Sequence, residues 1–303
     1  MVSDSENYVA ANTSLTVTVT AARRNQGYWG RVWTRLLRDW GTLAAISIIA
    51  LILLAAIFAP LLATHDPTQG SVLGRLKGFG YNGHILGTDE TGRDLYSRLL
   101  YGSRLTLITG VLPVLLALII GGFLGVIAGY FGGLINSLIM RVMDVLYAFP
   151  SVLLAIAITG MLGSGVTNTI LALTITFVPP LVRISETVTS QTRAMDFIEV
   201  ARSSGAGSFT IIRFHVLSNI LAPVLIYATS LISISIILAA GLSFLGLGVT
   251  PPNAEWGLML NNLRSAIWVN PAIAAFPGLM IFITSMSFNL MSDGLRRAMD
   301  LKL

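Results

Sequence analysis

Long stretches without a single Asp, Glu, Lys or Arg are the feature that most constrains this fold. They run over 40–64, 105–140, 145–182, 214–254 and 265–292. An ionised side chain at mid-bilayer costs about 2.5–3.5 kcal/mol, and about 20 apolar residues cross the hydrocarbon core. Only 11% of the 303 residues are charged, against about 25% in soluble domains. The chain is therefore predicted to be an all-α, polytopic membrane protein.

Six membrane-spanning helices are predicted when glycine clusters divide these stretches. They cover Leu43–Ala63 (within 40–63), Leu105–Gly129, Leu146–Leu162, Thr167–Leu181, Ile220–Leu247 and Ala272–Met291. The cluster Gly129–Gly133 is expected to end the second helix, and Gly160–Gly165 to form the turn of a helical hairpin. The predicted domains are a cytosolic tail at 1–39, loose over its first 22 residues, and a membrane domain at 40–303. This domain has an outer loop at 64–103, core helices at 104–292 and a polar loop at about 187–219.

The arginines set the predicted orientation, because cytoplasmic loops retain Lys and Arg. They collect before the first helix, in the polar loop and after the sixth helix. Both termini and the polar loop are therefore predicted to be cytosolic. The outer loop is an exception to this rule, because it must be external and yet carries four basic residues: Arg75, Lys77, Arg93 and Arg98. Four acidic residues balance their charge: Asp66, Asp89, Glu90 and Asp94.

Several kinds of chemistry are absent from the sequence. Neither lysine, Lys77 or Lys302, lies in a phosphate-binding loop, so any ATP hydrolysis is expected on another chain. No ionisable residue lies inside a predicted span, which disfavours an ion-coupled secondary transporter. No serine in a span has a partner for hydrolysis, so we expect no catalytic residues. There are no cysteines, and the three scattered histidines lack metal-ligand spacing, so no metal site is expected.

The polar loop has enough pattern to form two short helices. Met195–Ser203 is amphipathic, Ser204–Gly207 breaks it, and Ser208 is expected to cap a second helix that runs to Leu217. Apolar residues of this second helix fall on one side. On periodicity alone, the segment fits a connector lying on the membrane surface as well as it fits a docking element.

Motifs in this loop resemble a known family. Glu199-Val200-Ala201-Arg202-Ser203-Ser204-Gly205-Ala206, followed by Ile211–Asn219, resembles the EAA motif of ABC-importer permeases. In that family the second short helix is the coupling helix, which sits in a groove of the ATP-binding subunit. Val200 replaces the usual alanine, and Ser218 stands where proline is usual.

Three further stretches narrow the resemblance to the "C" permease of dipeptide, oligopeptide and nickel importers. They are Leu86–Arg104, Leu242–Gly248 with Pro251-Pro252 and Glu255-Trp256-Gly257, and Phe288–Leu290 with Asp293–Arg296. Together with the coupling motif they cover about residues 40–300. Departures are small, with Ser292 in place of a common glycine and Leu301 in place of a proline.

The resemblance implies a type I ABC-importer permease fold in a bacterial inner membrane. This chain would form half of a path for di- or oligopeptides. Nickel or another small solute is the alternative, and ion-coupled transport a weaker one. The implied partners are a homologous second permease, two ATP-binding subunits that carry ATP and Mg²⁺, and an extracytoplasmic binding protein. No cofactor is expected in this chain.

The resemblance also marks candidate site residues. The coupling set is Glu199, Ala201, Gly205, Ala206, Phe209, Ile212, Arg213, His215 and Leu217, and the outer set is Gly87, Thr88, Asp89, Gly92, Arg93, Asp94 and Arg98. The outer set is expected to start an interfacial helix after Thr88, with Asp94 and Arg98 paired at i,i+4. A structural collar is favoured there over substrate contact. Similarly, Trp256 and Trp268 are expected to be interfacial anchors rather than a substrate stack.

Overall fold

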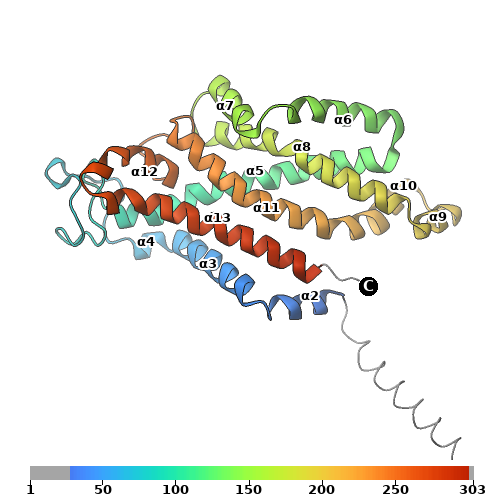
Figure 1. Cartoon of the computed structure of the whole chain (residues 1–303), viewed down its shortest axis with the longest axis horizontal. Coiled ribbons are helices and arrows are strands. Elements are labelled where there is room, and N and C mark those ends of the chain that lie inside the picture. Colours follow the sequence, from blue (N-terminus) through green and yellow to red (C-terminus); the bar gives the residue numbers. More distant parts are fainter. Residues whose placement is uncertain (1–27, 300–303) are drawn as a thin grey trace, which may run out of the picture.

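The computed structural model describes residues 28–299, and the regular structure in this range is helical (Figure 1). Within 28–299 the only β-type pairings are two isolated bridges, Tyr81 with His84 and Thr88 with Asp94. The predicted all-α class is confirmed. The predicted loose tail at residues 1–22, and Lys302, lie outside the described residues.

Five helices are long and apolar enough to cross a membrane. They are α3 (Trp40–Ile57), α5 (Leu95–Phe131), α8 (Val166–Arg193), the continuous helix Ser208–Phe244 that contains α11 (Leu217–Phe244), and α13 (Pro271–Met299). The pair α6 (Gly133–Tyr147) and α7 (Ser151–Leu162), bent by 86°, supplies a sixth crossing if it counts as one span. The count of six spans therefore agrees with the sequence, although one of them is broken.

The second span begins ten residues earlier than predicted. A separate interfacial helix was expected before Leu105, but α5 runs without a break from Leu95 to Phe131. Asp94 caps it by accepting a hydrogen bond from the Ser97 N–H, and both Leu95 and Leu99 are buried. Because these leucines face protein, the first turns of α5 extend the span instead of lying along the bilayer surface.

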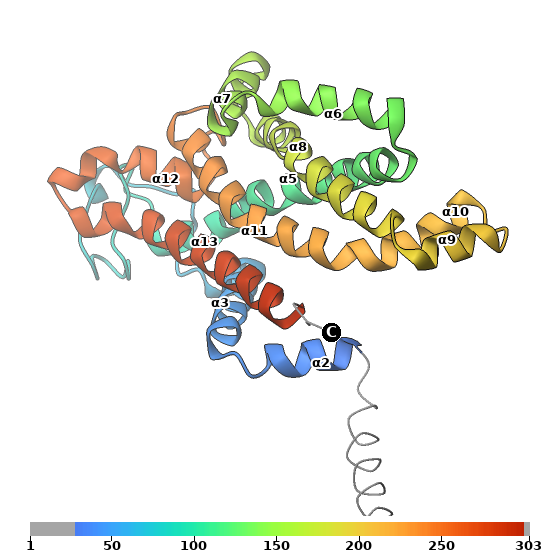
Figure 2. The ribbon, with the colours of Figure 1, turned by 45° about the vertical axis from the view of Figure 1, so that its right-hand side comes forward.

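The turn of the predicted helical hairpin is confirmed, but the bounds of its two helices differ from the prediction. The turn falls between α7 and α8, where Gly163 and Gly165 have positive φ. The helix α6, which the sequence did not predict, precedes the hairpin and projects away from α3 and α13 (Figure 2). Phe149 precedes Pro150, a position that disfavours helical backbone, so the chain bends between α6 and α7.

At the other end of the molecule, the polar loop forms one short helix and an extension of α11. The first is α9 (Asp196–Ser203), and the second comprises α10 (Ser208–Thr210) and the π-helical stretch η2 (Ile211–Val216), which continues directly into α11. The predicted separate second helix is therefore wrong. Gly207, not Ser208, occupies the N-cap position, so no side-chain hydrogen bond caps the start of this helix.

A helix, α2 (Tyr28–Leu36), lies within the predicted cytosolic tail and packs against the end of α13. Its buried residues Val32 and Leu36 contact a cluster with Ala298. Asp39 then caps α3 and forms an ion pair with Arg297, with 2.5 Å between Oδ2 and a guanidinium nitrogen. These contacts join the two chain ends of the described range, as Figure 1 shows.

Helices α5 and α8 form the closest helix pair in the interior. A Cβ added at Gly121, Gly125 or Gly129 of α5 would lie 2.5–2.9 Å from atoms of α8. Small residues let two helix backbones approach this closely, and such contacts drive association in lipid. The two helices thus form the central pair around which the other spans are arranged.

Candidate functional site

The outer signature folds into a buried ionic network around Asp89. One carboxylate oxygen of Asp89 accepts hydrogen bonds from the N–H groups of Thr91 and Arg93, both at 2.9 Å. The other accepts from the Arg93 Nε at 2.8 Å. Asp89 is 2% exposed and Arg93 9%. A carboxylate so buried needs this full set of donors, so this network, here called the collar, holds the outer loop together.

Arg98 joins this network rather than the predicted i,i+4 pair with Asp94. Its Nε lies 3.2 Å from Oδ2 of Asp89, and the side chain is 1% exposed. The guanidinium also donates to the carbonyl oxygens of Pro67 and Asn253. The predicted pair is therefore wrong. The Asp94 carboxylate accepts hydrogen bonds at the N-terminus of α5, and Arg98 pairs with Asp89 of the loop instead.

The remaining outer residues hold the loop's turns in place. Thr88 is fully buried and its hydroxyl donates to the carbonyl of Gly74. Gly92 has φ +79°, and an added Cβ would meet the Ser71 carbonyl oxygen; Gly87, with φ +81°, is equally crowded. Next to them, burial and the neighbouring charge of Asp89 raise the pKa of Glu90. The loop is thus folded around its signature residues.

Asp94 receives more hydrogen bonds than a helix cap needs. Its Oδ2 accepts from the Ser97 N–H at 2.8 Å and the Ser97 hydroxyl at 2.6 Å. Its Oδ1 lies 2.9 Å from Nδ1 of His84 and 3.9 Å from Nδ1 of His65. Burial pushes the pKa of Asp94 upward, but hydrogen bonds from Ser97, His84 and Thr64 outweigh this and hold the pKa below its ordinary value.

The meeting of His65, His84 and Asp94 corrects the expectation that the histidines are scattered. Their candidate ligand atoms lie within 4.8 Å of one another. The third histidine, His215, lies at the opposite end of the molecule in η2. Sequence spacing missed the group because loops bring together residues that are 10 and 29 positions apart.

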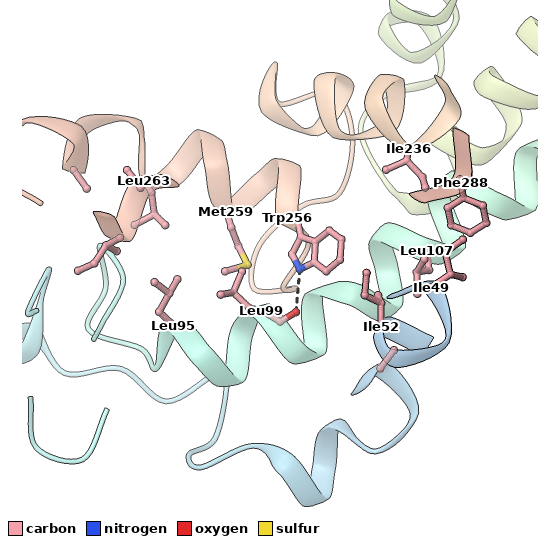
Figure 3. Packing of buried hydrophobic residues seen from close by; sticks show 14 residues of the cluster. Ile49, Ile52, Leu95, Leu99, Leu107, Ile236, Trp256, Met259, Leu263 and Phe288 are labelled. Atoms are coloured by element: carbon pink, nitrogen blue, oxygen red, sulfur yellow. Dashed lines mark hydrogen bonds between the residues drawn. The ribbon is translucent and has the colours of Figure 1, made fainter. Parts of the chain in front are cut away.

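Of the two tryptophans predicted as interfacial anchors, Trp256 is instead a core residue. It is fully buried, and its Nε1 donates to the Leu99 carbonyl oxygen at 2.9 Å (Figure 3). Glu255 beside it caps α12 (Trp256–Asn262) and also accepts from the Thr106 hydroxyl. Burial raises the pKa of Glu255, although the cap hydrogen bonds oppose the shift. Trp268, by contrast, is 90% exposed.

At the opposite end, the α9–η2 segment (Asp196–Val216) has one buried face and one exposed apolar face. Ile198, Ile211 and Val216 are buried in a cluster with Val126 and Tyr130 of α5. The exposed apolar side chains are Met195 just before α9, Phe197, Val200, Phe209 and Phe214; Val200, Phe209 and Phe214 are 65%, 75% and 61% exposed. Exposed aromatic residues on a well-anchored segment are typical of a protein-binding surface.

The predicted coupling residues divide between these two faces. Glu199, Gly205, Phe209 and Arg213 are exposed, whereas Ala201, Ala206, Ile212, His215 and Leu217 are half-buried. Within residues 28–299, Glu199 forms no ion pair. Gly205 has φ +85°, and a Cβ there would meet open space.

Two hollows lie along α8 and α11, and both include Tyr227. One, of about 400 Å³, is lined by residues around the α6–α7 bend, among them Tyr147 and Pro150, together with Pro179 and Pro180 of α8. The other, of about 440 Å³, is lined by α8, α11 and the end of α13. The lining residues of these hollows were not predicted from the sequence, although the helix-bending prolines were a usable signal.

These features define a class of protein: a helical membrane protein with hollows along its spans, a folded polar loop at one end and an exposed apolar surface at the other. The similarities to known proteins agree. Residues 121–303 match the family described as "Binding-protein-dependent transport system inner membrane component". Residues 27–77 match the "N-terminal TM domain of oligopeptide transport permease C". The chain belongs to the family of binding-protein-dependent transport system inner membrane components, and it is a permease subunit of an ABC importer.

Relatives and solved structures support this membership. The chain is 42% identical over 275 residues, 91% of each chain, to the glutathione transport system permease protein GsiD of Pectobacterium atrosepticum, and also to that of Shigella boydii. Its fold resembles the inward-facing MetNI methionine ABC transporter, with a TM-score of 0.55, 18% identity and coverage of 67% of this chain and 97% of that one. It also resembles an amino acid ABC transporter, with a TM-score of 0.52, 17% identity and coverage of 67% and 94%. The predicted permease fold is confirmed.

Proposed function

We propose that this permease forms half of an ATP-driven path for glutathione or similarly short peptides. The relatives named glutathione permeases, at 42% identity over 91% of each chain, support this substrate class. The hollows along α8 and α11 are the candidate surface for the path. Tyr147 and Tyr227 offer hydroxyl groups on this mostly apolar lining, which suits a small polar solute.

The α9–η2 segment is proposed to dock onto separate ATP-binding subunits and to transmit their movement. The exposed aromatic residues Phe209 and Phe214 carry this proposal, because the opposite face of their segment is anchored on α5. An anchored segment transmits displacement to the spans, whereas a loose connector would absorb it. A homologous second permease and an extracytoplasmic binding protein complete the proposed assembly.

The proposed orientation puts both chain ends and the α9–η2 segment in the cytosol. Charge pairing in the outer loop supports this orientation. Arg93 pairs with Asp89 and Glu90, Arg98 pairs with Asp89, and the Arg75 Nε donates to the carbonyl oxygen of Glu90. These arginines are committed to the fold of the loop, so they are weak topological signals.

The docking proposal is tested by replacing Phe209 and Phe214 with serine. Losing central aromatic contacts typically costs an interface about 2 kcal/mol or more, which corresponds to more than tenfold in affinity. We expect the ATP-binding subunits to be lost on co-purification and ATP-dependent uptake to stop. The control is Trp268→Ser, a still more exposed aromatic residue at the opposite end, which should leave ATPase association unchanged. Normal association of the double variant would refute the docking role.

The substrate is tested separately, with labelled glutathione and a labelled dipeptide presented to cells that express the complete transporter. Uptake should require ATP and persist when the proton gradient is collapsed. Competition by unlabelled glutathione but not by free amino acids would support the proposed substrate. Uptake of nickel or another solute without competition by peptides would refute the peptide proposal and support that solute as the substrate.

A further inference from the structure

Two histidines and an aspartate from three separate segments meet at the outer-loop end of the molecule. His65 follows α4 (Ala59–Leu62), His84 closes the small turn bridged to Tyr81, and Asp94 caps α5. Their ligand atoms lie within 4.8 Å of one another, and the two imidazole rings are 4.2 Å apart between centroids. This group takes no part in the buried Asp89 network described above.

Asp94 is oriented so that one oxygen is left to the histidines. Oδ2 is held by the backbone and hydroxyl of Ser97 and by the hydroxyl of Thr64. Oδ1 faces both imidazoles, 2.9 Å from Nδ1 of His84 and 3.9 Å from Nδ1 of His65. The carboxylate is completely buried, so its orientation is fixed by its neighbours rather than by solvent. Such supporting hydrogen bonds are what hold first-shell ligands in place.

The spacing fits a small divalent ion. Zinc lies about 2.0–2.2 Å from imidazole nitrogen and carboxylate oxygen, so two ligand atoms of a tetrahedral site are about 3.3–3.6 Å apart. The observed 2.9 and 3.9 Å lie on either side of that separation. Both histidines lie outside helices, in loop segments where the imidazoles can adjust toward a shared ion.

We propose that His65, His84 and Asp94 form a binding site for a divalent transition metal such as Zn²⁺. Two imidazoles with one carboxylate suit Zn²⁺, Ni²⁺ or Cu²⁺, whereas Mg²⁺ and Ca²⁺ prefer oxygen ligands only. The side chain of His65 is 38% exposed, so the ion is reached from solvent and keeps an open coordination position. Binding ties the end of the first span to the start of α5.

The test is equilibrium dialysis of the purified full-length chain against Zn²⁺, with an affinity tag that contains no histidine. We expect one Zn²⁺ per chain. His65→Ala and His84→Ala should each weaken binding at least about tenfold, since even supporting residues of metal sites contribute about 10–100-fold. His215→Ala is the matched control, because it removes the remaining histidine of this cysteine-free chain far from the site.

A second readout separates a lost site from a misfolded loop. Co²⁺ in place of Zn²⁺ should give the visible absorption of a four-coordinate ion in the wild type and in His215→Ala. His84→Gln, which keeps a polar side chain, should elute as a folded protein and lose that absorption. Absence of stoichiometric binding by the wild type, or binding that survives His84→Ala unchanged, would overturn the proposal and leave a hydrogen-bonded helix cap only.

Discussion

The two ends of this molecule are built on opposite principles. The outer-loop end carries a buried ionic network, with Asp89, Arg93 and Arg98 all less than a tenth exposed. The α9–η2 end carries apolar residues outside, with Phe209 and Phe214 more than half exposed. The Asp89 network satisfies its polar groups within the chain, whereas the α9–η2 segment leaves apolar surface for something else to cover.

This contrast separates self-contained structure from surface that needs a partner. A buried ionic network contributes little net stability, but removal of one member is costly because it strands the other charges. An exposed aromatic contributes little to the folded subunit alone and much to a complex. Substitutions at the first end should therefore destabilise the chain, and those at the second should affect assembly.

The largest effect is expected for Asp89→Ala. This change leaves Arg93 and Arg98 buried without their shared carboxylate, a situation that typically costs about 3–5 kcal/mol. We expect a large fall in the thermal unfolding midpoint of the detergent-purified chain. The control is Asp144→Ala, which breaks the exposed pair with Arg183 and should cost less than about 1 kcal/mol. Equal unfolding midpoints for the two variants would show that the collar is not a stabilising network.

A pair of glycine substitutions sharpens the same comparison. Gly92 and Gly205 have nearly the same φ, +79° and +85°, so an alanine at either position is strained by about 1–2 kcal/mol. At Gly92 the new Cβ would also collide with the Ser71 carbonyl oxygen, whereas at Gly205 it meets nothing within 4 Å. Overpacking adds about 1–3 kcal/mol, so Gly92→Ala should be the more destabilising change. The difference between their unfolding free energies measures the crowding alone, and a larger loss at Gly205 would contradict this account.

The smallest effect is expected from acid at the junction of α2, α3 and α13. Hydrogen bonds from Arg297 and Thr42 lower the pKa of Asp39 from 3.8 to about 2. Because the folded-state pKa is depressed, the stabilisation is present above pH 3.8 and is lost as the pH falls through about 2. Arg297→Gln should reduce this pH dependence, as measured by hydrogen exchange of α2 over that range. Both side chains are partly exposed, so the change should be small, and an unaltered acid profile would rule out the ion pair as its cause.

Charge-free runs predicted the spans well because lipid excludes ionised groups whatever the tertiary structure. The same rule did not predict α6, since Arg141 and Asp144 lie within that helix and interrupt the charge-free run. It also placed the end of α8 too early, because Arg183 and Glu186 continue the helix to Arg193. Local spacing could not find the partner of Arg98, because Asp89 reaches it only after the loop folds back. The α9–η2 segment was found by pattern, but its junction with α11 was not.

The unbroken length of α5 has a mechanical consequence. Thirty-seven residues at about 1.5 Å each make a rod of about 55 Å, well beyond the hydrocarbon core of a bilayer. One tip is capped by Asp94 and joined to the collar through Arg98, and Tyr130 near the other tip lies against the α9–η2 segment. Its glycine contacts with α8 leave no room for sliding. A displacement of α5 at one membrane surface would therefore move α5 and α8 together as a rigid pair, so that their ends at the opposite membrane surface move at the same time.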